Sequence, residues 1–401
     1  MAAAPASGTV EPIRVLHVLR APLGGLFRHV CDLAGGQQRA GLEVGVILGE
    51  RPRDPVSLAR LDELRKYCAL GVHVTPMSRL PGLGDAFNLA RITGRISKLR
   101  PHIVHGHGAK GGAYARLLPR LAGGARVYTP HGGALHFSRS SLQGVLFLAM
   151  ERIMRYRTDG VIFESDFSLR TFIDKVGEPK GRSIVIHNGV TEAEFEPVRA
   201  QADECADFVF IGELRRLKGV GTLIEAATRT GTPLFIRIVG SGPDSATFEE
   251  MARAAPAHVR IEFAGVMPAR QAFALGRVVV MPSHHESLPY VALEAAAAGM
   301  PLIATRVGGI PEIFGADANL LVPPADADAL AAALVHALGN VDGMQRAAER
   351  LRNRVRSEFS VSRMVEGVIG FYRQLLDPAS VPHAAGAANG LPGKFHEGVP
   401  L

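Results

Sequence analysis

Residues 13–48 read IRVLHVLRAPLGGLFRHVCDLAGGQQRAGLEVGVIL, and this stretch sets the pattern for the whole chain. The apolar run Ile13–Leu19 stops abruptly before Leu23-Gly24-Gly25. Phe27–Gln38 then has the apolar spacing of a helix, and Val44–Leu48 is apolar again. The stretch therefore predicts a strand, a glycine loop, a helix and a second strand.

The same alternation continues to about residue 190 and starts again near residue 208. Alternating strands and helices predict parallel, doubly wound sheets. The further strand-like runs are Val72–Pro76, Ile103–His107, Arg126–Thr129, Gly160–Phe163, Ile184–His187, Phe208–Ile211, Leu234–Val239, Arg260–Phe263, Val278–Met281, Leu302–Ala304 and Asn319–Val322. The helical runs between and after them are Leu58–Leu70, Ala86–Leu99, Gln143–Arg157, Asp166–Val176, Gly221–Ala227, Asp244–Ala254, Ala269–Leu275, Val291–Ala298, Ala327–Leu338, Met344–Arg356 and Val361–Leu376.

Two α/β domains of similar size are therefore expected. Residues 191–206, rich in Glu, Pro and Ala and without steady periodicity, are typical of a linker. We place an N-terminal domain at 1–195, a C-terminal domain at 196–376 and a loose tail at 377–401, where Ala, Gly and Pro accumulate.

Composition narrows the class of protein. The 401 residues are 47% hydrophobic and 21% charged, as in an ordinary globular protein of two or three domains. Cys31, Cys68 and Cys205 lie far apart without a CxxC pair, which argues against a disulfide framework or a structural zinc site. No apolar run reaches the roughly 18 residues of a membrane span, and Met1–Pro12 lacks the features of a secretory signal. We expect a cytoplasmic protein with reduced thiols.

The charge balance favours anionic partners. Forty-five Lys and Arg against 38 Asp and Glu give a net charge of +7. Nucleic acid, anionic lipid and phosphorylated metabolites would all fit such a surface. Aromatic residues are only 6% and tryptophan is absent, without a recognition-helix pattern, so nucleic acid is not expected.

In parallel sheets, ligands bind beyond the carboxyl ends of the strands, so the loops there are the candidate sites. Gly24 and Gly25 would let backbone N–H groups approach an anion, although a tight turn explains them equally well. His131, on a constrained turn, can donate to a sugar hydroxyl or carry a proton, unless its loop is merely solvated. His105 and His107 resemble a metal pair, but the sequence suggests no third ligand, and no metal is expected.

A cationic loop follows the strand Phe208–Ile211. Arg215, Arg216 and Lys218 lie within four residues, and cations packed so closely repel one another unless an anion compensates them. They suit a diphosphate, although a solvated basic loop is the alternative. The later glycine turn Gly240-Ser241-Gly242-Pro243 is interpreted as structural.

The most informative loop reads PSHHESLPYVALEA over residues 282–295. Pro289 suits the first position of a helix, which would bring the N–H groups of Ser287 and Leu288 to a positive helix end where a phosphate can dock. Glu286 and Glu294 are at most roughly 12 Å apart and can hold hydroxyls at opposite ends of a ligand whose middle is anionic. A sugar nucleotide is such a ligand. Capping and surface charge are the plainer interpretation of the two carboxylates.

These motifs, with Ala298-Gly299-Met300-Pro301 and the run GGIPE at 308–312, resemble the GT4 family of retaining glycosyltransferases, which have the GT-B architecture of two facing Rossmann-like domains around a cleft. The resemblance implies that Glu286 contacts the donor hexose and Glu294 the ribose. It also implies that Lys218 and a nearby arginine bind the diphosphate, and that His131 lines the sugar site. Family members often have an arginine where this chain has Glu213, so Arg215 or Arg216 would replace it.

The resemblance implies transfer from a nucleotide sugar to a hydroxyl of a saccharide or lipid-linked saccharide in polysaccharide biosynthesis, with retention of configuration and without a metal or other cofactor. We interpret Asp326-Ala327-Asp328 as a helix cap rather than a metal-binding pair. Basic and apolar residues over 139–157 are compatible with peripheral attachment to the inner face of a membrane. A sugar-nucleotide isomerase on the same fold and a non-catalytic donor-binding subunit are the alternatives.

Overall fold

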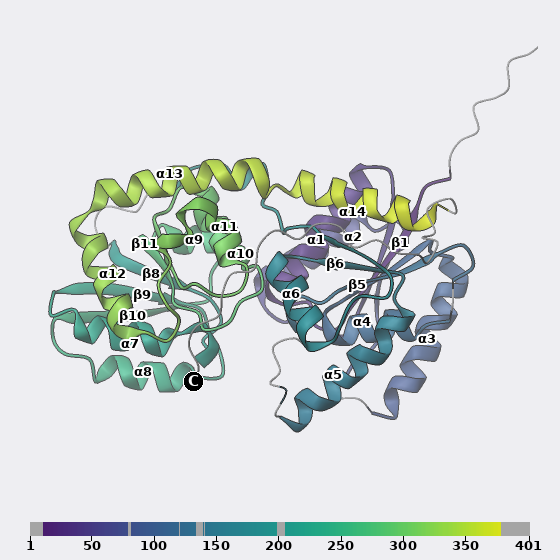
Figure 1. Cartoon of the computed structure of the whole chain (residues 1–401), viewed down its shortest axis with the longest axis horizontal. Coiled ribbons are helices and arrows are strands. Elements are labelled where there is room, and N and C mark those ends of the chain that lie inside the picture. Colours follow the sequence, from purple (N-terminus) through teal and green to yellow (C-terminus); the bar gives the residue numbers. More distant parts are fainter. Residues whose placement is uncertain are drawn as a thin grey trace, which may run out of the picture.

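The computed structural model describes residues 11–78, 82–119, 121–133, 139, 141–198 and 205–377, which form two lobes side by side (Figure 1). The N-lobe sheet has the strand order β3-β2-β1-β4-β5-β6-β7, and the C-lobe sheet has the order β10-β9-β8-β11-β12. Every pairing between these strands is parallel. The predicted α/β class with two parallel sheets is confirmed.

The N-lobe strands are β1 (Arg14–Leu19), β2 (Glu43–Leu48), β3 (Val72–Val74), β4 (Ile103–His107), β5 (Ala125–Thr129), β6 (Gly160–Phe163) and β7 (Arg182–Val185). Its helices are α1 (Gly24–Arg39), α2 (Pro55–Tyr67), α3 (Gly84–Leu99), α4 (Gly108–Leu117), α5 (Leu142–Met154) and α6 (Asp166–Lys175). In β1, β4, β5 and β6 all residues except Arg14 are buried, because helices cover both faces of the sheet.

The C-lobe strands are β8 (Ala206–Ile211), β9 (Leu234–Val239), β10 (Val259–Gly265), β11 (Gly276–Met281) and β12 (Leu302–Ala304). Its helices are α7 (Val220–Arg229), α8 (Ser245–Arg253), α9 (Ala269–Phe273), α10 (Tyr290–Ala297), α11 (Ile310–Phe314), α12 (Ala327–Gly339) and α13 (Val341–Glu358). The strand predicted at Asn319–Val322 is wrong. A 3-10 helix covers Gly315–Leu320, and Val322 makes only an isolated bridge to Thr305.

Helix α4 has no counterpart in the sequence prediction. Its sequence, GAKGGAYARL, is too poor in large apolar residues to show a helical pattern. The helix forms because glycines let it approach the sheet closely. A Cβ on Gly111 would lie 2.3 Å from the Val18 carbonyl oxygen, and one on Gly112 would lie 2.2 Å from the Tyr128 ring.

The last helix, α14 (Val361–Leu376), returns to the N lobe. Figure 1 shows α13 along one lobe and α14 along the other. Met364, Val368 and Tyr372 belong to the same buried core as strand β1 and helix α1. The predicted C-terminal domain of 196–376 is therefore wrong for this helix, which the chain uses to tie its lobes together. Residues 1–10 and the predicted loose tail beyond Asp377 lie outside the described residues.

Candidate functional site

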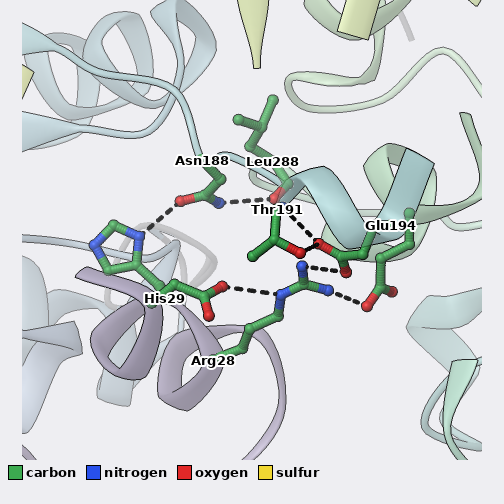
Figure 2. Close-up of polar contacts among 8 residues, drawn as sticks. Arg28, His29, Asn188, Thr191, Glu194 and Leu288 are labelled. Carbon is green, nitrogen blue, oxygen red and sulfur yellow. Dashed lines mark hydrogen bonds and ion pairs between the residues drawn. The ribbon is translucent and has the colours of Figure 1, made fainter. Parts of the chain in front are cut away.

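The candidate site lies where loops after the strands of both lobes meet. Ser287, after β11, donates through its hydroxyl to Glu164, after β6, at 3.0 Å. Its hydroxyl also lies 2.8 Å from that of Ser168. The Asn188 amide donates to the Leu288 carbonyl at 3.1 Å (Figure 2). The predicted donor-binding loop is thus docked directly on the N lobe.

Glu286 and Lys218 lie together at this junction. The Lys218 ammonium donates to a Glu286 carboxylate oxygen at 2.6 Å, and the Ser283 hydroxyl donates to the same oxygen at 2.8 Å. Only 8% of Glu286 is exposed. A cavity of about 300 Å³ is lined by Glu286 and Ser287 from the C lobe and by Gly132 from the N lobe. The structure therefore brings Glu286 to a cavity between the lobes and Lys218 into contact with Glu286, and their roles toward a donor stay predictions.

Glycines create the close approaches that this junction needs. A Cβ on Gly219 would lie 1.8 Å from the Pro282 carbonyl oxygen, and one on Gly308 would lie 2.1 Å from the Glu286 carbonyl oxygen. Both glycines also have positive φ angles, +74° and +59°. Another residue at either position would push the cationic loop or the Glu286 loop out of place.

Glu294 is engaged by the N lobe. Its carboxylate, on α10, accepts a hydrogen bond from the Arg28 guanidinium on α1, and burial raises the pKa of Glu294. Arg28 also contacts Glu194 at 2.5 Å and Asp32 at 3.3 Å. Its guanidinium lies 4.4 Å from the centre of the Tyr290 ring. A ribose hydroxyl at Glu294 would therefore share this carboxylate with Arg28.

Figure 2 shows Arg28 pointing into a group of carboxylates that includes Glu194. Glu194 is fixed by Thr191, whose backbone N–H and hydroxyl donate to its second oxygen at 2.7 and 3.0 Å. Burial alone would lower the pKa of Arg28, but the charges of Glu294 and Glu194 raise it instead. The guanidinium is therefore a permanent cation that holds α1, α10 and the segment after β7 together.

The two predicted arginines of the cationic loop differ in their surroundings. The Arg215 side chain forms an ion pair at 3.2 Å with Glu213, the residue that occupies the usual arginine position of the family. Arg216 has an exposed side chain, and its backbone N–H donates to Asp244 at 2.8 Å. Either side chain can reach solvent near the loop, and which one binds a diphosphate stays a prediction.

The glycine pair and the proline of the predicted anion sites lie at the starts of α1 and α10. Gly24 has a φ of +58° and begins α1, while a Cβ on Gly25 would lie 3.1 Å from the Tyr290 ring of α10. Pro289 is the N-cap of α10 rather than its first residue, because its ψ of 127° is extended. Neither helix has a side-chain cap, so both N-termini keep backbone N–H groups for other partners.

His131 lies deeper than a solvated loop residue, with a φ of +50° and a side chain that is 5% exposed. Its Nδ1 is 2.6 Å from Glu164, and its Nε2 is 3.0 Å from Nδ1 of His107. Both ring nitrogens therefore already have protein partners. A hydrogen bond from His131 to a sugar would require one partner to be released.

Further histidines gather behind His131. The argument that His105 and His107 lack a third neighbour is wrong, because β1 places His17 beside them, with ring nitrogens within 4.8 Å of one another. The nitrogens of His105 face Thr129 and Tyr372 at 2.8 and 2.6 Å. Since these nitrogens have hydroxyl groups of the protein as partners, hydrogen bonds alone can account for the position of the His105 ring. The absence of a metal stays a prediction.

A larger cavity, of about 900 Å³, opens in the N lobe beside the histidines. His107 and His131 form one wall, and Asp85, Lys110 and Tyr114 provide further polar groups. Most of the remaining wall is apolar and comes from α1, α3, α4 and α5: Leu26, Leu89, Ala113, Leu117, Phe147, Met150 and Met154. The cavity can therefore hold a molecule with both polar and apolar parts.

Sequence reasoning missed Arg28 and Glu164. Each has a recognisable position: Arg28 follows the glycine pair by three residues, and Glu164 comes directly after β6. A carboxylate at the carboxyl end of a parallel strand is a signal that could have identified Glu164. Glu294, the partner of Arg28, is 266 residues away along the chain, so no local sequence pattern identifies this pair.

Comparisons with known proteins agree over most of the chain. The family model for glycosyltransferase family 4 matches residues 23–194, and that for glycosyl transferases group 1 matches residues 206–340. Glycogen synthase of Mycobacterium tuberculosis is 29% identical, with 84% of this chain and 88% of the relative aligned. D-inositol 3-phosphate glycosyltransferase of Acidothermus cellulolyticus is 28% identical over 88% of this chain and 86% of the relative.

Among solved structures, sucrose-phosphate synthase from Thermosynechococcus elongatus superposes with a TM-score of 0.74 at 24% identity. The match covers 91% of this chain and 99% of that one, and it shows the shared fold. Within the part of the chain that the structure describes, none of the helices is long and apolar enough to cross a bilayer.

Proposed function

Since the chain belongs to the family 4, or group 1, glycosyltransferases, with the GT-B fold, we propose that it moves a sugar from a nucleotide-sugar donor to a hydroxyl of a saccharide acceptor with retention of configuration. The contact that Lys218 makes with Glu286, which lines the interlobe cavity, carries this proposal. It pairs the carboxylate assigned to the hexose with the cation assigned to the diphosphate. The bond that breaks in the transfer joins the hexose to the diphosphate.

We extend the proposal to catalysis without a metal. Lys218 and one arginine of the loop would neutralise the leaving diphosphate. The interpretation of Asp326 as a helix cap is confirmed, because its carboxylate accepts from the Ala329 N–H at 2.9 Å. Asp328 pairs with Arg229 at 2.6 Å. Both carboxylates of the candidate metal pair thus have structural partners.

The acceptor would enter the cavity of about 900 Å³, which adjoins His131. Its apolar walls favour an acceptor with a lipid part, such as a lipid-linked saccharide. Apolar residues at the starts of α3 and α5 extend these walls outward, with Leu83 97%, Phe87 66% and Leu142 88% exposed. Both helices protrude from the same side of the N lobe (Figure 1). This surface supports peripheral attachment to a membrane.

The arginines that suggested membrane attachment have other partners. Arg152 donates to the Lys175 carbonyl at 2.8 Å and Arg155 to the Glu178 carbonyl at 3.2 Å. Arg157 donates to the Arg116 and Leu118 carbonyls at 3.0 and 3.2 Å. They brace α5 against its neighbours, so the apolar side chains are the better test of a membrane surface.

The transfer reaction is tested with radiolabelled UDP-, GDP- and ADP-sugars, with and without saccharide and lipid-linked saccharide acceptors. We expect one donor to give a product only when an acceptor is present, at the same rate in EDTA, and NMR to show a retained anomeric configuration. Isomerisation of the donor in the absence of acceptor would indicate a sugar-nucleotide isomerase. Donor binding without turnover would indicate a non-catalytic donor-binding subunit. Loss of activity in EDTA that Mn²⁺ or Mg²⁺ restores would contradict the metal-free mechanism.

Membrane attachment is tested by sedimentation with vesicles that contain anionic phospholipid. Replacing Leu142 and Leu146 by Glu is expected to lower the partition coefficient at least about tenfold, since two apolar side chains no longer enter the interface. The matched control replaces the exposed C-lobe residues Leu320 and Val341 by Glu and should bind like the unaltered protein. Equal binding of all three proteins would leave the α3 and α5 surface without a membrane role.

A further inference from the structure

Three imidazole rings form an unbroken row of hydrogen bonds across the N-lobe sheet. His17 Nε2 faces the Gln37 carbonyl oxygen at 2.8 Å, and His17 Nδ1 faces His107 Nε2 at 2.9 Å. His107 Nδ1 faces His131 Nε2 at 3.0 Å, and His131 Nδ1 faces Glu164 Oε1 at 2.6 Å. The row follows the strand order β1-β4-β5-β6, since each of these strands or the loop after it supplies one member.

The number of protons in this row follows from its two ends. An amide oxygen and a carboxylate oxygen can only accept hydrogen bonds, so each of the four contacts needs one hydrogen from a ring. Three neutral imidazoles carry only three N–H groups. With Glu164 ionised, the row as the structure has it therefore holds a fourth ring proton, and one of its histidines is an imidazolium.

The surroundings of Glu164 indicate which ring is charged. Glu164 is 5% exposed, and its other partners, Asn188 and Ser287, are neutral donors. A buried carboxylate needs a cation, and His131 is the ring in contact with it. Burial opposes ionisation of Glu164, but the charge and hydrogen bond of His131 outweigh burial and lower the pKa of Glu164 to about 2.

The other rings that face His131 stay neutral at physiological pH. Burial lowers the pKa of His17 to about 4 and that of His107 well below its usual range. His29, on α1, lies with its ring centre 4.8 Å from that of His131, and burial lowers its pKa to about 3. His131 is therefore the one member of the row with a carboxylate to balance its charge.

We propose that Glu164 and His107 are positioning residues that hold His131 as an imidazolium, with His17 and Gln37 completing the row. His131 lines the cavity of about 900 Å³, and the next residue, Gly132, lines the cavity of Glu286. A fixed cation at this position would stabilise the negative charge that the leaving diphosphate gains. This catalytic consequence rests on the proposed function, whereas the protonation state does not.

A competing arrangement exists and can be distinguished. If the Gln37 amide is turned by 180°, its NH₂ group donates to His17 and three neutral rings complete the row. Every bond of the row is then reversed except the one that His131 donates to Glu164. The Gln37 amide nitrogen is buried and has no hydrogen-bond partner among the described residues, so this turn would supply one. The two arrangements differ by one proton, which NMR detects directly.

The experiment records ¹⁵N spectra of the full chain with labelled histidine between pH 6.5 and 9, with His131→Gln to assign the ring. We expect both His131 nitrogens to be protonated at pH 7.5, and expect Glu164→Gln to lower the pH at which that proton is lost by at least about one unit. In Glu164→Gln the alkaline limb of the pH profile of kcat should shift to lower pH by the same amount, while the donor KM changes less than threefold.

The matched control is His105→Gln. Its ring centre lies 4.0 Å from that of His107, but its nitrogens face Thr129 and Tyr372 outside the row, so the alkaline limb should not move. Three neutral rings in the unaltered protein at pH 7 would overturn the proposal, as would one equivalent of tightly bound metal in the purified protein. An imidazolium in a protein that transfers no sugar would instead count against the proposed function alone.

Discussion

Glu286→Gln is expected to lower kcat by about 10³-fold while free nucleoside diphosphate binds nearly as tightly as before. The side chain is 8% exposed and accepts hydrogen bonds from Lys218 and Ser283. In the proposed reaction, positive charge develops on the hexose as the diphosphate departs, and the buried carboxylate would stabilise that charge only in the transition state. Steady-state kinetics give kcat, and calorimetry gives the affinity for the diphosphate.

Glu225→Gln is the matched control, because Glu225 lies on the same lobe with 51% of its side chain exposed. Its kcat should stay within about twofold of the unaltered protein, as for surface substitutions away from a site. Loss of nucleotide affinity at Glu286 with turnover preserved would mean that the donor lies along α10 in the opposite direction. Glu286 would then hold the ribose and Glu294 the sugar.

The fold was largely predictable because apolar periodicity marks buried strands and amphipathic helices. The runs at Ile103–His107, Gly160–Phe163 and Leu234–Val239 coincide with β4, β6 and β9 to the residue. The pattern failed where packing depends on small residues, as in α4. It also says nothing of which lobe a helix joins, because α14 has the same amphipathic pattern whichever core covers it.

For the site, the sequence predicted residues but not their partners. Glu286 and Lys218 could be placed near each other because both follow C-lobe strands in one sheet. The row of His17, His107 and His131 depends on which strands are neighbours in space. The order β1-β4-β5 depends on how the helical connections of the N lobe cross the sheet, and no local sequence motif predicts it.

Arg28→Met is expected to lower the melting temperature by about 3–6 °C at pH 8. The change leaves Asp32, Glu194 and Glu294 gathered without their shared cation, and removing one partner of a buried ion pair costs about 3 kcal/mol or more. The apolar stem is kept, so packing against Tyr290 is largely preserved. Thermal unfolding followed by calorimetry measures the shift, and Arg39→Met, at the exposed end of the same helix, is the control.

The pH dependence of this loss identifies its cause. Burial already raises the pKa values of Asp32 and Glu294 in the native protein, and Arg28 opposes that rise. Without Arg28 both folded-state values rise further above those of the unfolded chain, so the folded variant binds more protons than the unfolded one and its stability falls as pH increases. The gap in melting temperature between variant and unaltered protein should therefore narrow between pH 8 and pH 5. A gap that is independent of pH would show that Arg28 acts through packing, and that the lobes are not held together by its charge.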